Sequence, residues 1–174
     1  MSGSIYEREL REILSGNEEF IEKFIKNFGE EEKFYYRSII KKPFFVVRAA
    51  GSMGIDIMAV RDDFSIPIEV KSSKENVLRF TQASSRAQKQ AEYYVLIARK
   101  SGVFPVYAFR LKRANEDPWR FFTIPGMEIH GRMVLLYDVL PKMDLTQNGN
   151  FVMKWEKGMA LHKFFSYINR DFSL

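Results

Sequence analysis

The sequence has 174 residues, the usual size of one domain, and its 46 % hydrophobic and 15 % aromatic content excludes a disordered chain. It contains no cysteine and two histidines, which excludes a disulfide framework, a thiolate metal site, an iron–sulfur cluster and a thiol nucleophile. No hydrophobic run approaches the ~20 residues of a membrane span, and the N-terminus lacks the apolar stretch of a signal peptide. We therefore expect an intracellular protein without membrane contact, whose chemistry rests on carboxylates, lysines or hydroxyls.

Charge is unevenly distributed along the chain. The formal net charge is +5 and the pI is about 9.3. Residues 1–35 contain nine acidic and five basic side chains, whereas residues 71–120 contain eleven basic and four acidic ones. This concentration of positive charge is typical of a protein with a polyanionic partner, although solvated basic surfaces are also common.

The N-terminal half of the chain predicts two helices followed by three strands. Hydrophobic residues recur at helical spacing over Ser4–Leu14 and Asn17–Phe28, and Gly29 is expected to end the second helix. The acidic run Glu30–Glu32 is then interpreted as a solvated break. β-branched and aromatic runs predict three strands, over Phe44–Arg48, Ile55–Arg61 and Ile66–Lys71. A short polar turn joins the last two strands, so we expect them to form a hairpin.

The C-terminal half predicts further strands between two helices. Alanines at helical spacing predict a helix over Thr81–Lys100, although its second part, Tyr93–Ala98, could equally be a strand. The elements expected after it are a hairpin of Val103–Leu111 and Trp119–Ile124, strands over Met133–Leu140 and Phe151–Trp155, and a final helix over Met159–Ile168. This order favours an α/β fold with a mixed central β-sheet flanked by helices. The length favours one domain over residues 1–174.

Charged side chains alternate with hydrophobic ones in the third strand. The alternation places Glu69 and Lys71 on one face of the sheet. A hairpin in which opposite residues have numbers that sum to 127 would place Asp56 opposite Lys71 on that face. Two carboxylates and an ammonium on a half-buried surface are costly unless a divalent cation such as Mg²⁺ neutralises them. The pattern therefore predicts a metal-dependent phosphodiesterase site, in which the lysine orients a water or stabilises charge on the phosphate.

The same residues also allow a structural interpretation. Asp56 is then only a turn residue, and Glu69 and Lys71 form an ordinary pair on an exposed sheet face. Glu7 has the spacing of a capping-box partner of Ser4, which is an alternative to a role at a metal.

The segments Glu7–Leu10, Val46–Ser52 and Glu69–Lys71, together with Asp56, resemble the archaeal Holliday-junction resolvases, a branch of the PD-(D/E)xK nuclease superfamily. Similarity continues more weakly through later segments, over Phe104–Arg110, Trp119–Phe121 and Phe151–Val152. The resemblance implies a restriction-endonuclease-like fold. It also implies a homodimeric endonuclease that uses Mg²⁺, or Mn²⁺ in its place, to cut paired strands of four-way DNA junctions.

The resemblance also implies roles for individual residues. The catalytic positions would be Glu7, Arg48, Ser52, Asp56, Glu69 and Lys71, and the metal-binding positions would be Glu7, Asp56, Glu69 and Val70. The resemblance and the charge distribution together predict seven basic residues as DNA contacts: Arg8, Arg48, Arg86, Lys89, Arg110, Lys112 and Arg113. Basic residues on a helix can equally form a solvated face.

Two stretches depart from the family pattern. About residues 15–42 are longer than the family's usual link, and about residues 126–149 also have the character of an insertion. Ile55 stands where a proline usually precedes the first aspartate. Gln90 and Tyr94 have the spacing found in RecB-like nucleases of the same superfamily, but packing on an amphipathic helix produces the same spacing.

We therefore expect a junction-resolving endonuclease of DNA recombination and repair, associated with the nucleoid. The alternative enzyme is another nuclease of the superfamily that acts on duplex, flap or single-stranded DNA. A DNA-binding module with a vestigial site is a further alternative, but the intact Asp56, Glu69 and Lys71 argue against it. A basic scaffold that binds other proteins is the remaining interpretation.

Paired cuts in a four-way junction require two active sites, and hence two chains related by a two-fold axis. We expect a homodimer whose interface draws on aromatic residues beyond the needs of one core. These residues are Phe104, Tyr107, Trp119, Phe121, Phe122, Phe164, Phe165 and Tyr167. The alternative is that the two inserted stretches bury these side chains internally.

Overall fold

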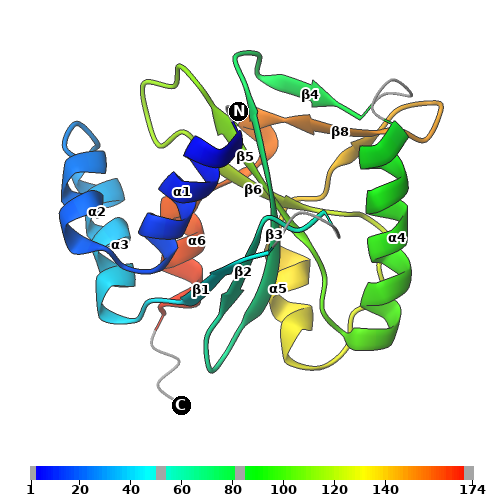
Figure 1. Ribbon diagram of the computed structural model, residues 1–174, viewed down its shortest axis with the longest axis horizontal. Helices are drawn as coiled ribbons and strands as arrows, with labels where there is room; N and C mark the ends of the chain where they lie inside the picture. The colour runs from blue at the N-terminus through cyan, green and yellow to red at the C-terminus, as the bar shows by residue number, and fades with distance from the viewer. Residues whose placement is uncertain (1–2, 50–53, 81–84, 171–174) are drawn as a thin grey trace.

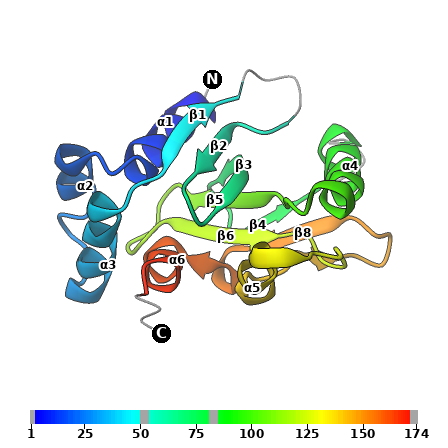
Figure 2. The same cartoon turned by 90° about the horizontal axis from the view of Figure 1, so that it is seen from below.

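The computed structural model describes residues 3–49, 54–80 and 85–170 and contains a mixed central sheet flanked by helices, as expected (Figures 1 and 2). Neighbouring strands are antiparallel except for β3 and β5, which are parallel. In spatial order the strands are β1 (Phe45–Arg48), β2 (Ile57–Val60), β3 (Ser65–Ser73), β5 (Val106–Leu111), β6 (Trp119–Thr123) and β9 (Met159–Ala160). β3 therefore lies inside the sheet, with a partner on each side.

The two faces of the sheet are covered differently. Helices α1 (Gly3–Leu14) and α6 (Leu161–Ile168) pack on one face, and α4 (Ser85–Ser101) lies on the other (Figure 2). A second sheet of β4 (Val77–Arg79), β8 (Phe151–Lys154) and β7 (Asp144–Leu145) adjoins the α4 side. There the ring of Phe80 contacts that of Tyr107 with centroids 5.7 Å apart. The α4 face of β3 and β5 is thereby shielded from water.

Three elements of the structure differ from the sequence prediction. Helix α2 covers Glu18–Phe24 and ends earlier than predicted, because the rings of Phe24 and Phe28 turn onto Tyr36. The acidic run predicted as a break is the first turn of α3 (Glu30–Lys41), where carboxylates complement the positive end of the helix dipole. The predicted strand Met133–Leu140 is helix α5 (Val134–Val139), after a 3₁₀ turn at Gly131–Met133.

The other predicted elements are present, although their ends are shifted. Tyr93–Ala98 is helical, as part of α4, and the final predicted helix begins with the two residues of β9. β4 and β7 were not predicted from the sequence, because strands of two or three residues contain too little alternation to recognise.

The predicted hairpin register was wrong by two residues. Ile57 lies opposite Ile68 and Val60 opposite Ser65, so the numbers of opposite residues sum to 125. Asp56 directly precedes this ladder, and its amide donates to the carbonyl of Ile68 at 3.0 Å. The turn closes early because the Arg61 amide donates to the carbonyl of Phe64. A shift of two residues conserves the alternation, so the predicted face was still correct.

Asp117 connects α3 and α6 to the sheet. Its fully buried carboxylate accepts hydrogen bonds from the Tyr36 hydroxyl (2.9 Å), the Trp119 amide (3.1 Å), and both the amide and the Nδ1 of His162 (2.9 Å each). Three elements thus share one acceptor. These hydrogen bonds matter because each buried donor left without a partner would cost about 1–3 kcal/mol.

The aromatic residues assigned to a dimer interface lie in the core instead. Seven of the eight are buried, and Tyr167 is partly buried and packs against the core. The helices and the second sheet that surround the central sheet provide the surface against which these rings pack, so this argument for an interface was wrong. None of the described helices is long and apolar enough to cross a membrane.

We predict that Asp117→Ala lowers the free energy of unfolding by about 3–5 kcal/mol, because it leaves several buried donors unpaired at once. Urea denaturation followed by circular dichroism measures the change. Asp144→Ala is the control, since Asp144 is an exposed acid paired with Lys154 and Lys157, and its loss should cost less than about 1 kcal/mol. Equal effects of the two substitutions would contradict the connecting role of Asp117.

Candidate functional site

Asp56, Glu69 and Lys71 come together on the α4 face of the sheet. Asp56 directly precedes β2, and the two other residues belong to β3. Lys71 Nζ donates to Glu69 Oε1 at 2.6 Å, and Asp56 Oδ2 accepts from the amide of Val70 at 2.7 Å. The structure therefore places two carboxylates and one ammonium on adjacent strands, as the alternation predicts.

Glu69 is the most perturbed acid of this group. The residue is 6 % exposed, and its Oε2 has no hydrogen-bond partner among the described residues. Burial raises the pKa of Glu69 to about 7; the ion pair with Lys71 opposes the shift, while Asp56 and Glu7 add to it. A buried carboxylate with one open oxygen is a group that binding of a cation would stabilise.

Glu7 and Arg48 form an ion pair at the edge of the site. Arg48 Nη2 donates to Glu7 Oε2 at 2.9 Å, which joins α1 to the end of β1. Glu7 is near enough to raise the pKa of Glu69. Half of the Arg48 side chain is exposed, so its guanidinium is accessible to a ligand.

Tyr107 is a residue of the site that sequence reasoning missed. It lies opposite Glu69 in the parallel pairing of β3 with β5. Its hydroxyl is buried without a hydrogen-bond partner in the described part of the chain, and burial together with Glu69 raises its pKa. No sequence signal distinguishes Tyr107, because it alternates in β5 as any core residue does.

Helix α4 brings two further residues to the site. Burial, Glu69 and Asp56 raise the pKa of Tyr94, which places this residue near both acids. One turn earlier, the amide of Gln90 occupies the space above Gly54, where an added Cβ would lie 1.0 Å from Gln90 Nε2. The spacing of Gln90 and Tyr94 was the signal that could have identified them, and packing was the other interpretation weighed for it.

The donor set of this site fits a hard divalent cation in part. Carboxylate oxygens of Asp56 and Glu69 lie on neighbouring strands, and Glu69 Oε2 is unsatisfied, which is the chemistry that Mg²⁺ prefers. Glu7, by contrast, is paired with Arg48. Accordingly, no group of three acidic or histidine side chains in the described residues is arranged to hold a metal. A metal site here would therefore be built around the two carboxylates of Asp56 and Glu69.

The basic residues predicted to bind DNA are dispersed. Arg8, Arg86, Lys89 and Arg113 are exposed. Arg110 is engaged internally, since it donates to both carboxylate oxygens of Glu9 (2.6 and 3.2 Å) and lies over the ring of Tyr6, which Lys112 also approaches. Ser52 lies outside the described residues. His162 is held by Asp117, and His130 is exposed.

We predict that Glu69→Gln stabilises the metal-free protein at neutral pH by about 1–3 kcal/mol, because one pKa unit corresponds to about 1.4 kcal/mol. A carboxyl whose pKa is raised from 4.5 to about 7 destabilises the fold as pH rises between those values. The wild type should therefore lose stability from pH 5 to 7 in chelator, and the variant should lose less. Urea denaturation at several pH values measures this, and identical pH profiles would contradict the buried charge.

The chain is similar to proteins of a known family. The family model "Archaeal holliday junction resolvase (hjc)" matches residues 29–139, a range that contains Arg48, Asp56, Glu69 and Lys71 but not Glu7. A similar solved structure is that of Archaeoglobus fulgidus Hjc, "a Holliday junction resolvase from an archaeal hyperthermophile", with 25 % identity, coverage of 71 % of this chain and 82 % of that chain, and a TM-score of 0.45. No curated protein shows a significant match. Because the family model matches well over half of its residues, the chain belongs to the archaeal Holliday junction resolvase (Hjc) family.

Proposed function

We propose that the protein is a junction-resolving endonuclease that hydrolyses DNA phosphodiester bonds with Mg²⁺ held at Asp56 and Glu69. We propose further that residues 1–174 form one nuclease domain, with insertions at about 15–42 and 126–149, and that it acts inside the cell on chromosomal DNA. Membership of the Hjc family supports the activity and the substrate class. The observation that carries the assignment of the site is that the Asp56 carboxylate accepts from the Val70 amide, next to Glu69, while Lys71 pairs with Glu69.

The residues of the site divide the chemistry among them. A bound Mg²⁺ would supply Lewis acidity toward the phosphate and lower the pKa of a coordinated water. Asp56 and Glu69 would hold the ion through carboxylate oxygens. We expect the backbone carbonyl of Val70 to be a further ligand. If Glu69 binds a cation, the Lys71 ammonium would no longer be its main partner. Lys71 would then orient the attacking water and stabilise negative charge on the phosphate.

The edge of the site is suited to the DNA strand. Arg48 is half exposed, and its pairing with Glu7 fixes it between α1 and β1. We propose that this guanidinium contacts a phosphate next to the cut, that Glu7 completes the metal site when Arg48 shifts to the DNA, and that Ser52 contributes from the loop that follows. The exposed Arg8, Arg86, Lys89 and Arg113 would contact phosphates farther away, with Lys112 beside them.

We predict that the protein cuts a labelled four-way junction in Mg²⁺ or Mn²⁺ and not in chelator, while Ca²⁺ supports binding without cleavage. Asp56→Asn, Glu69→Gln and Lys71→Ala should each lower the single-turnover rate by about 100-fold or more, since each removes a group acting on the reacting phosphate. Gel electrophoresis of cleaved strands measures the rate. Arg99→Ala, an exposed residue on α4, is the control.

Duplex, flap and single-stranded DNA of matched sequence decide between the alternatives. Preferential cutting of one of these over the junction would assign the protein to another kind of nuclease of the superfamily. Binding without cleavage in every metal would mean a vestigial site. Full activity in chelator would refute the metal site itself.

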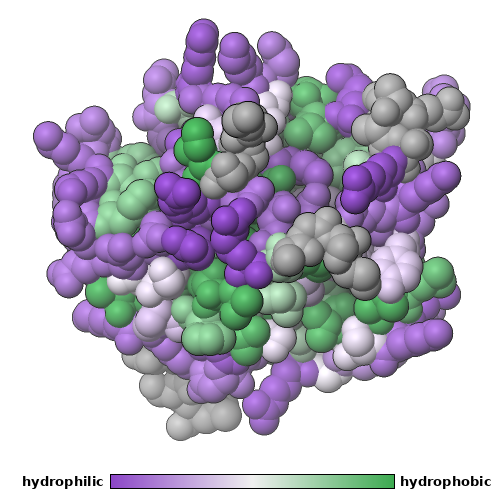
Figure 3. Space-filling model, in the orientation of Figure 1, coloured by the Kyte–Doolittle hydropathy of each residue, from purple (hydrophilic) through white to green (hydrophobic). Residues whose placement is uncertain are grey.

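We also propose that the protein is a homodimer whose interface includes the outer face of β1 and β2. Phe45, Val47 and Val60 are 75 %, 46 % and 37 % exposed and lie side by side on that face. Figure 3 shows hydrophobic side chains gathered over this part of the molecule. The alternation of β2 puts Val60 on the same face as Asp56, so a second copy seated here would place the two sites near each other.

We predict that Phe45→Glu together with Val47→Glu converts the dimer into the 20.5 kDa monomer, because two charges cannot be desolvated in an apolar interface. Analytical ultracentrifugation at micromolar concentration measures the mass. Phe34→Glu is the matched control, since Phe34 is 68 % exposed but lies on α3. A wild type that is monomeric with and without junction DNA would overturn the dimer, and dissociation by Phe34→Glu would place the interface elsewhere.

A further inference from the structure

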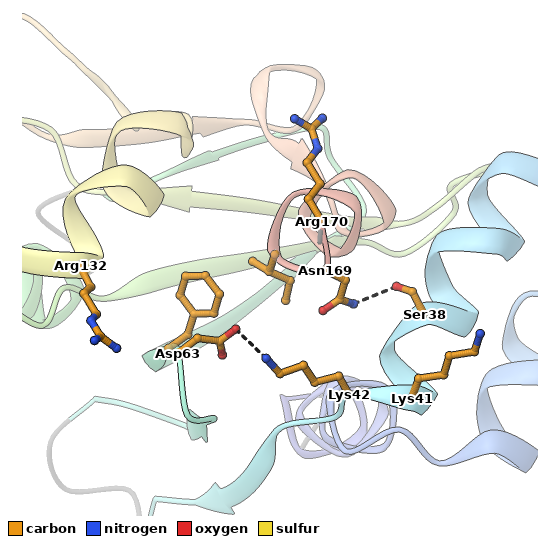
Figure 4. A pocket seen from close by; sticks show the side chains of 9 residues that line it. Ser38, Lys41, Lys42, Asp63, Arg132, Asn169 and Arg170 are labelled. Atoms are coloured by element: carbon orange, nitrogen blue, oxygen red, sulfur yellow. Dashed lines mark hydrogen bonds and ion pairs between the residues drawn. The ribbon is translucent and has the colours of Figure 1, made fainter. Parts of the chain in front are cut away.

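A basic pocket lies at the opposite end of β3 from Lys71 (Figure 4). It has a volume of about 580 Å³ and is formed by the C-terminal end of α3, the β2–β3 turn, the 3₁₀ turn before α5 and the end of α6. The residues that line it are Ser38, Lys41, Lys42, Asp63, Phe64, Arg132, Ile168, Asn169 and Arg170. Four of these are cationic and one is anionic.

The floor of this pocket is a rigid, charge-paired structure. Arg61, whose side chain is 4 % exposed, donates to both oxygens of Asp63 at 2.6 and 2.8 Å and to Asn169 Oδ1 at 2.8 Å. Asn169 in turn donates to Ser38 Oγ at 2.9 Å. Asp63, the one acid among the described residues that line the pocket, is therefore already neutralised by Arg61, and the elements around it are joined by these hydrogen bonds.

The rim of the pocket retains positive charge. Lys42 lies 3.3 Å from Asp62 and from Asp63. Lys41, Arg132 and Arg170 are exposed and form no ion pair with any described residue. Three accessible cations over a neutralised floor attract an anion from solution.

The arrangement of the cations favours a chain of phosphates over a single small anion. In Figure 4 the head groups of Lys41, Arg132 and Arg170 come from three different elements and lie apart around the pocket, where they do not converge on one point. A free phosphate is bound by donors that converge on it. Separated cations instead suit a nucleic-acid strand, which carries a separate phosphate at every nucleotide.

We propose that this pocket binds the phosphate backbone of a DNA arm, away from the bond that is cut. The pocket and the candidate site lie at opposite ends of β3 (Ser65–Ser73), because Asp63 and Phe64 directly precede its first residue and Lys71 lies near its last. The inference rests on the proposed function, because it concerns DNA already engaged at Asp56 and Glu69.

The test compares two triple variants of equal charge. Lys41→Ala/Arg132→Ala/Arg170→Ala removes the rim cations, and Lys26→Ala/Lys100→Ala/Lys163→Ala removes three exposed lysines elsewhere. Junction binding in Ca²⁺ is measured by fluorescence anisotropy over a range of NaCl concentrations. We expect the pocket variant to bind at least about tenfold more weakly and to reduce the slope of log K against log salt by two to three, since each phosphate contact contributes about 0.9. Equal effects of both variants would overturn the proposal.

Neutral phosphates locate the contact on the DNA. Methylphosphonates placed one at a time along the junction arms should weaken wild-type binding at some positions away from the cut, and at those positions should have little further effect on the pocket variant. Equal weakening of both proteins would overturn the contact. Displacement of DNA from the wild type, but not from the pocket variant, by millimolar inorganic phosphate would show a site for small anions instead.

Two controls separate this proposal from the proposed function. Thermal unfolding must show that the pocket variant is folded, and at saturating protein in Mg²⁺ it should still cut the junction within about threefold of the wild-type rate. A wild type that cuts no DNA would refute the proposed function, while the two salt slopes would still decide whether the pocket binds DNA.

Discussion

The two-residue alternation of β3 is the constraint on which both the core and the candidate site depend. Ile66 and Ile68 are buried against α1 and α6, and Glu69 and Lys71 project from the strand between partners on both sides. Because β3 lies inside the sheet, Glu69 cannot reach bulk water, and its charge must be balanced locally by Lys71 or by a cation. The packing that stabilises the fold thus also buries the Glu69 carboxylate, whose negative charge then needs a nearby positive partner.

A second buried acid has the opposite role. Asp117 is fully buried, as Glu69 nearly is, yet donors from α3, β6 and α6 satisfy it. Among the described residues, one Glu69 oxygen and the Tyr107 hydroxyl have no hydrogen-bond partner, and the two residues lie opposite each other in the pairing of β3 with β5. Saturated buried polar groups stabilise and fix the fold, whereas unsaturated ones are expected where a ligand binds. This difference, more than burial itself, distinguishes the structural acid Asp117 from Glu69 of the candidate site.

The strand β3 also connects the candidate site with two other surface features. β3 extends from the turn at Asp63, beneath the basic pocket, to the charged group at Glu69 and Lys71. The exposed apolar face of β1 and β2 lies beside that group. One strand therefore connects the candidate site with the proposed phosphate-binding pocket, and a strand inside a sheet holds its two ends more rigidly than a flexible loop would.

The sequence by itself determined the mixed α/β class, the strand that carries Glu69 and Lys71, and the face they share, because period-two alternation is a local property. It did not determine α3, whose acidic first turn resembles a solvated break until Asp117 and Tyr36 are seen together. Nor did it determine the hairpin register, since Arg61 and Phe64 set it through a local hydrogen bond that alternation does not encode. Tyr107, and the approach of Gln90 to Gly54, belong to the tertiary structure alone. They arise where β5 and α4 pack against β3, and pairings between distant segments leave no periodic trace in the chain.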